Sequence, residues 1–221
     1  MSKWLKKVVL ATLLLISSIS HAKPETIELD GRNVVVMDEN MDDTSTHKFM
    51  QSIIGARIAL PQEEKLYVVI SSNGGSYKSA LTLEGVLDKV SSNSNVVVIC
   101  KYCASAAGYV FATFKGTKLV TPGSTVMMHE MVVMRMSAEM TKDDHTIANL
   151  RENSDEFNKA MYSHLGISKE EYEKHIVGKE WNLKGADIVK NHLADKLVIV
   201  HCNSYIENVI PHTCANDDGA D

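Results

Sequence analysis

Apolar residues along the chain form short uninterrupted runs that are separated by longer segments with a different spacing. Runs rich in Val, Ile and Leu occupy residues 34–37, 67–70, 96–99, 118–120 and 126–128, and they predict strands. Because these runs are continuous rather than alternating with polar residues, we expect the strands to be buried on both faces, as in a parallel sheet.

Between these runs, apolar residues recur every three or four positions, which predicts helices. Helices are expected over residues 42–60, 79–90, 104–114, 141–165, 168–176 and 183–192, with a last strand over 196–200. Ser168, with Glu171 three residues later, predicts a capped helix start. The alternation of strands and helices indicates an α/β fold with a largely parallel sheet.

The first residues are typical of an export signal. Lys3, Lys6 and Lys7 precede a mostly apolar stretch over 8–19, and Ser20 and Ala22 place small residues at the two positions that determine cleavage. We expect a signal peptide over residues 1–22, cleaved after Ala22, and a periplasmic or secreted mature protein. An uncleaved anchor is the alternative, although the apolar stretch is short for a membrane span, so no stable span is expected after cleavage.

The remainder is expected to form one domain over residues 23–200, followed by a polar tail over 201–221. Apolar residues make up 44% of the 221-residue chain and charged residues 23%, as in ordinary globular proteins. Without the leader's three lysines, 20 basic and 28 acidic side chains remain, for a net charge of −8. An acidic surface argues against nucleic acid or an anionic membrane as a partner.

Four cysteines stand in two pairs. Cys202 and Cys214 are close together in the polar tail, and export would permit a disulfide between them. Cys100 and Cys103 have the spacing of a redox or zinc motif, but no second pair with zinc-finger spacing exists. Their sequence favours Cys100 as a buried residue at a strand end and leaves the redox state of the pair open.

Three segments that follow predicted strands contain the parts needed for acyl transfer. In residues 71–76, two glycines end a strand and leave backbone N–H groups available for an oxyanion, although they also suit a simple turn. Ser105 lies among small residues at a predicted helix start, where the N–H of Ala106 could be a second donor; the alternative is that Ser105 only caps the helix. His129 directly follows an apolar strand, a position that a packed histidine would also occupy.

Taken together, four segments resemble the proteolytic subunit of the Clp protease family. These are residues 71–76, 103–108, 122–129 and 183–195. The resemblance extends from about residue 34 to residue 200. It implies a crotonase-like α/β fold built of stacked βαβ units.

The resemblance assigns roles residue by residue. It implies that Ser105 is the nucleophile and His129 its general base. The N–H groups of Gly75 and Ala106 would form the oxyanion hole. The family's third catalytic residue is an aspartate, and the matching position here is Glu180, whose longer carboxylate would orient the imidazole.

Other carboxylates and one contact segment differ from this pattern. Asp187 and Asp195 are poorer candidates for the third residue, because each suits a helix surface or a helix end. Residues 131–136 replace a glycine-rich family strand with Met and Val, which suit either a hydrophobic subunit contact or a buried strand. The resemblance implies a homo-oligomer, with a ring as one form.

The function expected from this pattern is an ATP-independent serine endopeptidase that cleaves peptides or unfolded proteins outside the cytoplasm. No cofactor is expected, and export makes an ATPase partner improbable. A Ser-Lys enzyme resembling signal peptide peptidase A would need Lys78 or Lys101 near Ser105. The same fold would also suit acyl-CoA chemistry or a non-enzymatic assembly role, since a fold does not determine a function.

Overall fold

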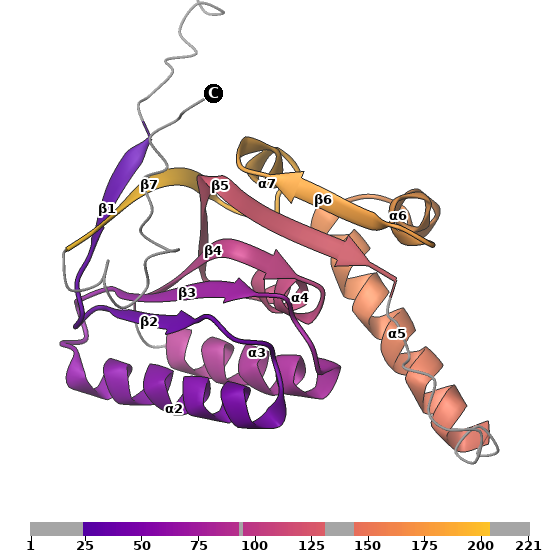
Figure 1. Ribbon diagram of the computed structural model, residues 1–221, viewed down its shortest axis with the longest axis horizontal. Helices are drawn as coiled ribbons and strands as arrows, with labels where there is room; N and C mark the ends of the chain where they lie inside the picture. Colours follow the sequence, from indigo (N-terminus) through magenta and orange to yellow (C-terminus); the bar gives the residue numbers. More distant parts are fainter. Residues whose placement is uncertain (1–23, 93–94, 131–143, 204–221) are drawn as a thin grey trace, which may run out of the picture.

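The computed structural model describes residues 24–92, 95–130 and 144–203, with the side chains of α5 described from residue 152 (Figure 1). The strands are β1 (Glu25–Leu29), β2 (Val34–Met37), β3 (Leu66–Ser72), β4 (Val96–Ala104), β5 (Thr117–His129), β6 (Glu180–Lys184) and β7 (Lys196–Cys202). The helices are α2 (Asp43–Ala59), α3 (Tyr77–Ser91), α4 (Ala106–Thr113), α5 (Asp144–Leu165), α6 (Lys169–Ile176) and α7 (Ala186–Lys190).

The seven strands form one mostly parallel sheet in the order β1-β7-β5-β4-β3-β2. Each neighbouring pair along this path is parallel, whereas β6 lies antiparallel to β5. The expected α/β fold class with a largely parallel sheet is therefore confirmed. Parallel strands place their carboxyl ends at one edge of the sheet, where sites gather in such folds.

Strand β5 bends in its middle and so belongs to two parts of the sheet. Residues 117–120 pair with the start of β4 and with β7, whereas residues 125–129 pair with the end of β4 and with β6. At the bend, the Ser124 hydroxyl donates to the Cys100 carbonyl at 2.5 Å and accepts from the Thr121 N–H at 2.7 Å. The two short strands predicted over 118–120 and 126–128 are thus one bent strand.

Two apolar clusters lie on the two faces of the sheet. The larger one joins the sheet to α2 through α7, and α2 and α3 cover this face side by side (Figure 1). The smaller one is made by strands alone and includes Ile27 and Leu29 of β1, Val69 of β3 and Val198 of β7. Val69 is fully buried in the smaller cluster, and its chain neighbours Val68 and Ile70 are fully buried in the larger one. Strand β3 is therefore buried on both faces, as the continuous apolar run predicted.

Polar caps determine where several helices begin. The Asp42 side chain accepts from the N–H groups of Thr44 and Ser45 at the start of α2. Ser168 accepts from the Glu171 N–H at the start of α6, where the sequence predicted a cap. These bonds satisfy donors that a helix start would otherwise leave unpaired.

Three expectations about elements are wrong. No strand was expected at β1, and β7 extends to Cys202 rather than ending at residue 200. The helix expected over 183–192 is divided into β6 and the shorter α7. The physical reason is that residues 180–184 pair with β5, and Gly185, with φ of 44°, then turns the chain sharply.

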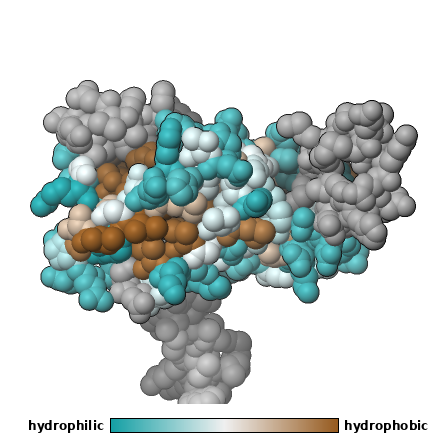
Figure 2. Space-filling model, turned by 90° about the horizontal axis from the view of Figure 1, so that it is seen from below, coloured by the Kyte–Doolittle hydropathy of each residue, from teal (hydrophilic) through white to brown (hydrophobic). Residues whose placement is uncertain are grey.

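The outer face formed by α2 and α3 contains apolar surface among polar side chains (Figure 2). Ile54 and Ile58 of α2 are 43% and 80% exposed, and Leu81 of α3 is 40% exposed. Residues four apart on a helix share a face, so Ile54 and Ile58 lie together. Within the described residues, no helix is long and apolar enough to cross a membrane.

Candidate active site

Ser105 lies in the sharp turn between β4 and α4, with an uncommon backbone conformation. Its φ is 55° and its ψ is −121°, a region that favours glycine. The residue is at the N-cap position of α4, but its side chain makes no capping hydrogen bond. Its backbone is held on both sides, because its N–H donates to the Met127 carbonyl at 2.8 Å and its carbonyl accepts from the Tyr109 N–H at 3.1 Å. The hydroxyl is therefore presented without serving as a helix cap.

The turn after β3 packs directly against the Ser105 turn, and Gly74 makes this approach possible. A Cβ atom added to Gly74 would lie 2.7 Å from the Ala106 nitrogen and 2.9 Å from the Ser105 Cβ, and it would also strike the Ala104 carbonyl oxygen. Real Cβ atoms do not approach so closely, so only glycine fits here. Gly74 is thus explained by contact with the Ser105 segment as well as by its own turn, whereas a Cβ on Gly75 would strike the Met41 backbone.

The orientation of Gly75 follows from its pairing with the loop after β2. Gly75 forms a parallel bridge with Met41, in which Met41 N–H donates to the Gly74 carbonyl and Ser76 N–H donates to the Met41 carbonyl, both at 2.7 Å. A trans peptide holds its N–H opposite its carbonyl. The Gly75 N–H therefore points away from Met41, toward the side of β4 on which Ser105 follows.

Ala106 is the first residue of α4, so its N–H has no partner within the helix. Among the described residues, neither this group nor the Gly75 N–H donates a hydrogen bond. The Gly75 N–H, the Ala106 N–H and the positive end of α4 thus converge beside Ser105, an arrangement that favours a developing negative charge.

His129 ends β5 on the strand next to the Ser105 turn. Ala104 is in register with Met127, so Ser105 and His129 continue from adjacent parallel strands at the same edge of the sheet. The His129 ring is half-buried, and its Nδ1 lies 2.5 Å from the Glu130 carbonyl oxygen. A carbonyl only accepts, so Nδ1 carries the proton and Nε2 is left as the basic nitrogen.

Glu180 begins β6 and is the residue opposite His129 in the antiparallel pair. Opposite residues in such a pair project to the same face, with Cβ atoms about 4.5–5.5 Å apart. The Glu180 side chain is exposed, and within the described residues no hydrogen bond joins it to His129. The structure therefore places Glu180 at the strand position opposite His129, while the bond to Nδ1 is made by a backbone carbonyl. Glu180, which lies between the helices expected over 168–176 and 183–192, is thus part of a strand.

Lys118 contacts the C-terminal end of α4. Its amine donates to the Ala112 carbonyl at 2.9 Å, in the last turn of α4. Burial lowers the pKa of Lys118, and the nearby charge of Asp195 partly opposes that effect. Asp195 accepts from the Lys118 N–H at 2.7 Å, near the start of β5 and so far along the strand from His129.

Other predicted residues do not reach Ser105. Asp187 is exposed on α7, and the Lys101 amine donates to Thr121 at 3.4 Å. Lys78 lies on α3, at the solvent-facing side of that helix's first turn. Among the described residues, no group of three or more His, Cys, Asp or Glu side chains is placed to hold a metal ion.

The cysteine pair whose state the sequence left open is bonded. Cys100 and Cys103 form a disulfide within β4. Cys202 takes part in a disulfide as well, but Cys214 lies outside the described residues, so the pairing of these two stays a prediction. Residues 1–22 and 131–136 also lie outside the described residues.

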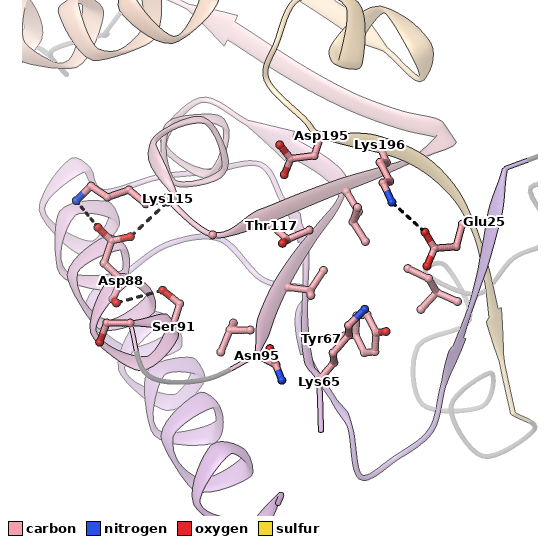
Figure 3. Close-up of a pocket in the computed structure, with 16 residues that line it drawn as sticks. Glu25, Lys65, Tyr67, Asp88, Ser91, Asn95, Lys115, Thr117, Asp195 and Lys196 are labelled. Carbon is pink, nitrogen blue, oxygen red and sulfur yellow. Dashed lines mark hydrogen bonds and ion pairs between the residues drawn. The ribbon is translucent and has the colours of Figure 1, made fainter. Parts of the chain in front are cut away.

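A large hollow of about 1000 Å³ lies at the other edge of the sheet (Figure 3). Its lining includes Val96 and Thr117 at the starts of strands, whereas Ser105 follows the end of β4 and His129 ends β5. Its charged groups form ion pairs, Lys115 with Asp88 at 2.6 Å and Lys196 with Glu25 at 3.3 Å (Figure 3). This hollow is therefore separate from the Ser105 turn.

The residues that matter at the site include two that the sequence did not indicate. The Glu130 carbonyl bonds the imidazole, and no side-chain pattern reveals a backbone acceptor. Gly74 was noticed only as part of a turn, although its close approach to Ser105 is a specific requirement. A glycine pair after a strand, followed later by a serine after the next strand, is the signal that could have identified it.

Comparison with known proteins agrees with this geometry. The protein-family model described as Clp protease matches residues 21–200. No curated protein matches the chain significantly. Since this family model covers most of the sequence, and the mostly parallel α/β fold is consistent with it, the chain belongs to the Clp protease family.

Proposed function

We propose that this chain is a serine endopeptidase that works without an ATPase and cleaves peptides or unfolded proteins outside the cytoplasm. Family membership supports a peptidase at the level of the family. The observation that carries the finer assignment is the Ser105 turn, where an uncommon backbone conformation presents a hydroxyl that caps nothing. Strained conformations of this kind persist where the surrounding structure holds them for function.

In the proposed reaction, Ser105 Oγ attacks the carbonyl carbon of the substrate and its proton passes to His129 Nε2. The carbonyl oxygen becomes an oxyanion, which the N–H groups of Gly75 and Ala106 stabilise. When the intermediate collapses, His129 returns the proton to the leaving amine and an acyl-enzyme remains. Water, deprotonated by His129, then releases the acid and restores the serine.

The imidazole needs a fixed tautomer for these transfers. The Glu130 carbonyl retains the Nδ1 proton, which leaves Nε2 basic. Glu180, opposite His129, supplies a negative charge that stabilises the imidazolium during each proton transfer. A Ser-Lys mechanism is less well supported, because the Lys101 amine contacts Thr121.

The proposed assembly is a homo-oligomer. Exposed Ile54, Ile58 and Leu81 on the α2–α3 face supply apolar surface of the kind that subunit contacts bury (Figure 2). Export, if residues 1–22 are a cleaved leader, would separate the protein from ATP and hence from an unfolding ATPase. Substrates would then be chains that are already short or unfolded.

A fluorophosphonate probe tests the assignment directly. The mature protein should be labelled at Ser105, and labelling should be lost in both Ser105→Ala and His129→Ala. Ser168→Ala is a matched control, since Ser168 is an exposed helix-capping serine away from the site and its variant should label normally. Equal labelling of wild type and Ser105→Ala would refute the nucleophile assignment. Absence of labelling in a folded wild type would favour the non-enzymatic role.

A further inference from the structure

The disulfide between Cys100 and Cys103 lies inside β4, just before the nucleophile. Both cysteines are fully buried, and Cys103 is two residues from Ser105. In a regular strand, residues three apart would be about 10 Å apart and on opposite faces. Here their Cα atoms are 5.9 Å apart. The strand is therefore contracted between the two cysteines.

This contraction coincides with a bulge of β4 relative to β3. Along β3, Ile70 pairs with Cys100 and Ser71 with Tyr102, so Lys101 is the extra residue of the bulge. Along β5, the register changes at the same place because β5 bends there: Val120 pairs with Cys100, and the next pair joins Thr125 to Tyr102. A bulge bends a strand and redirects the residues that follow it. The disulfide thus closes a loop around the bulged residue.

The segment after the bulge determines where the nucleophile lies. Cys103 and Ala104 are in register with residues 126 and 127, and the Ser105 N–H bonds to the Met127 carbonyl. Loss of the bulge would shift this register by one residue, which reverses every following side chain. Ser105 would then lose its alignment with the strand that ends in His129.

We infer that the Cys100–Cys103 disulfide is the element that assembles the active site, so that the chain gains peptidase activity only when this bond forms. The inference rests on the proposed function. A loop this short constrains the unfolded chain less than a long one, so the bond contributes more through local geometry than through global stability. A chain kept in a reducing compartment would fold with a misaligned Ser105.

The chemistry is thiol–disulfide exchange with a disulfide oxidant. One cysteine thiolate attacks the oxidant, and the second displaces the resulting mixed disulfide. The two thiols lose two protons and two electrons in total, and the oxidant disulfide becomes two thiols. Since both cysteines are buried once folded, exchange is fastest before the core closes around them, and the finished bond reacts only slowly with reductants.

The experiment uses the mature chain carrying Cys202→Ala and Cys214→Ala, which leaves one cysteine pair. The protein is refolded in buffers with different ratios of reduced to oxidised glutathione. Three quantities are measured on each sample: the bridged fraction by alkylation and peptide mass, the rate of fluorophosphonate labelling, and amide hydrogen exchange over residues 101–108. A matched Cys100→Ala/Cys103→Ala variant should not respond to the buffer.

The labelling rate should rise in proportion to the bridged fraction, with the dithiol form at least tenfold slower while its circular dichroism stays native. Equal labelling of folded dithiol and bridged forms, with unchanged exchange over 101–108, would overturn the inference.

If the dithiol form does not refold, the native bridged protein is treated with a trialkylphosphine. Labelling must then fall before the circular dichroism changes, and a simultaneous loss would also overturn the inference. If even the bridged wild type fails to label, the proposed function is wrong. In that case, faster amide hydrogen exchange over 101–108 on reduction would still support the role of the disulfide in aligning Ser105. Unchanged exchange would refute that role as well.

Discussion

Replacing Ser105 by glycine should make the protein more stable while abolishing its chemistry. Ser105 has φ of 55° and ψ of −121°, and the N-cap of α7 has nearly the same conformation, with φ of 44° and ψ of −118°. At α7 the residue is Gly185, for which this region carries no Cβ penalty. The same backbone turn is thus built once from glycine and once from a strained serine.

The size of the effect follows from two opposing contributions. A residue with a Cβ in a sparsely populated region of this kind costs about 1–3 kcal/mol. Glycine also lowers the free energy of unfolding by about 0.4–1 kcal/mol, because it gives the unfolded chain more conformational freedom. Ser105 is only half-buried and its side chain makes no capping bond, so few contacts are lost. Ser105→Gly should therefore raise the free energy of unfolding by about 1 kcal/mol, or roughly 2–4 °C in Tm for a chain of this size.

Thermal and urea unfolding of Ser105→Gly, Ser105→Ala and wild type at one protein concentration provide the measurement. Ser105→Ala keeps the Cβ and the strain, so its stability should stay close to that of wild type. Ser52→Gly, at an exposed position inside α2, is the control and should lose about 0.5 kcal/mol through helix propensity. If Ser105→Gly is no more stable than Ser105→Ala, the turn stores no strain and the reasoning fails.

Three further predictions concern the carboxylate, the glycine turn and the leader. Glu180→Gln should lower kcat about tenfold with little change in KM, because an exposed charge near His129 contributes a modest, screened interaction and the Glu130 carbonyl still holds Nδ1. Asp187→Asn is the control and should leave turnover on an unstructured protein substrate unchanged. Equal kinetics of the two variants would exclude a role for Glu180. Gly74→Ala should abolish fluorophosphonate labelling by pushing the two turns apart, even where circular dichroism is native; normal labelling would contradict the close packing. The exported protein should begin at Lys23, and an intact mass that includes Met1 in a soluble fraction would refute leader cleavage.

The sequence alone was enough to predict much of the central fold. Continuous apolar runs identified the buried strands such as β3, because a strand covered on both faces has no polar side to show. Three- and four-residue spacing identified α2 and α3, and the cap at Ser168 set the start of α6. Parallel strands share their carboxyl edge, so residues after consecutive strands, such as Ser105 and His129, could be expected to meet.

Other features depended on contacts between distant parts of the chain. Residues 180–184 alternate polar and apolar side chains over too short a stretch to exclude a helix, and pairing with β5 makes them a strand. Strand β1 exists through its pairing with β7 at the far end of the sequence, with Glu25 opposite Val198. In both cases the deciding hydrogen bonds come from a partner strand that local propensity does not encode.

The finer geometry of the site belongs to the tertiary structure in the same way. The types of residue in the site, a serine, a histidine, a carboxylate and two glycines, can be read from the sequence. The positive φ of Ser105, the contact of Gly74 with the Ala106 nitrogen and the bond of His129 to the Glu130 carbonyl cannot. Each depends on backbone groups that the tertiary structure holds in place. Because the backbone is chemically the same at every position, the sequence does not show which backbone groups will meet.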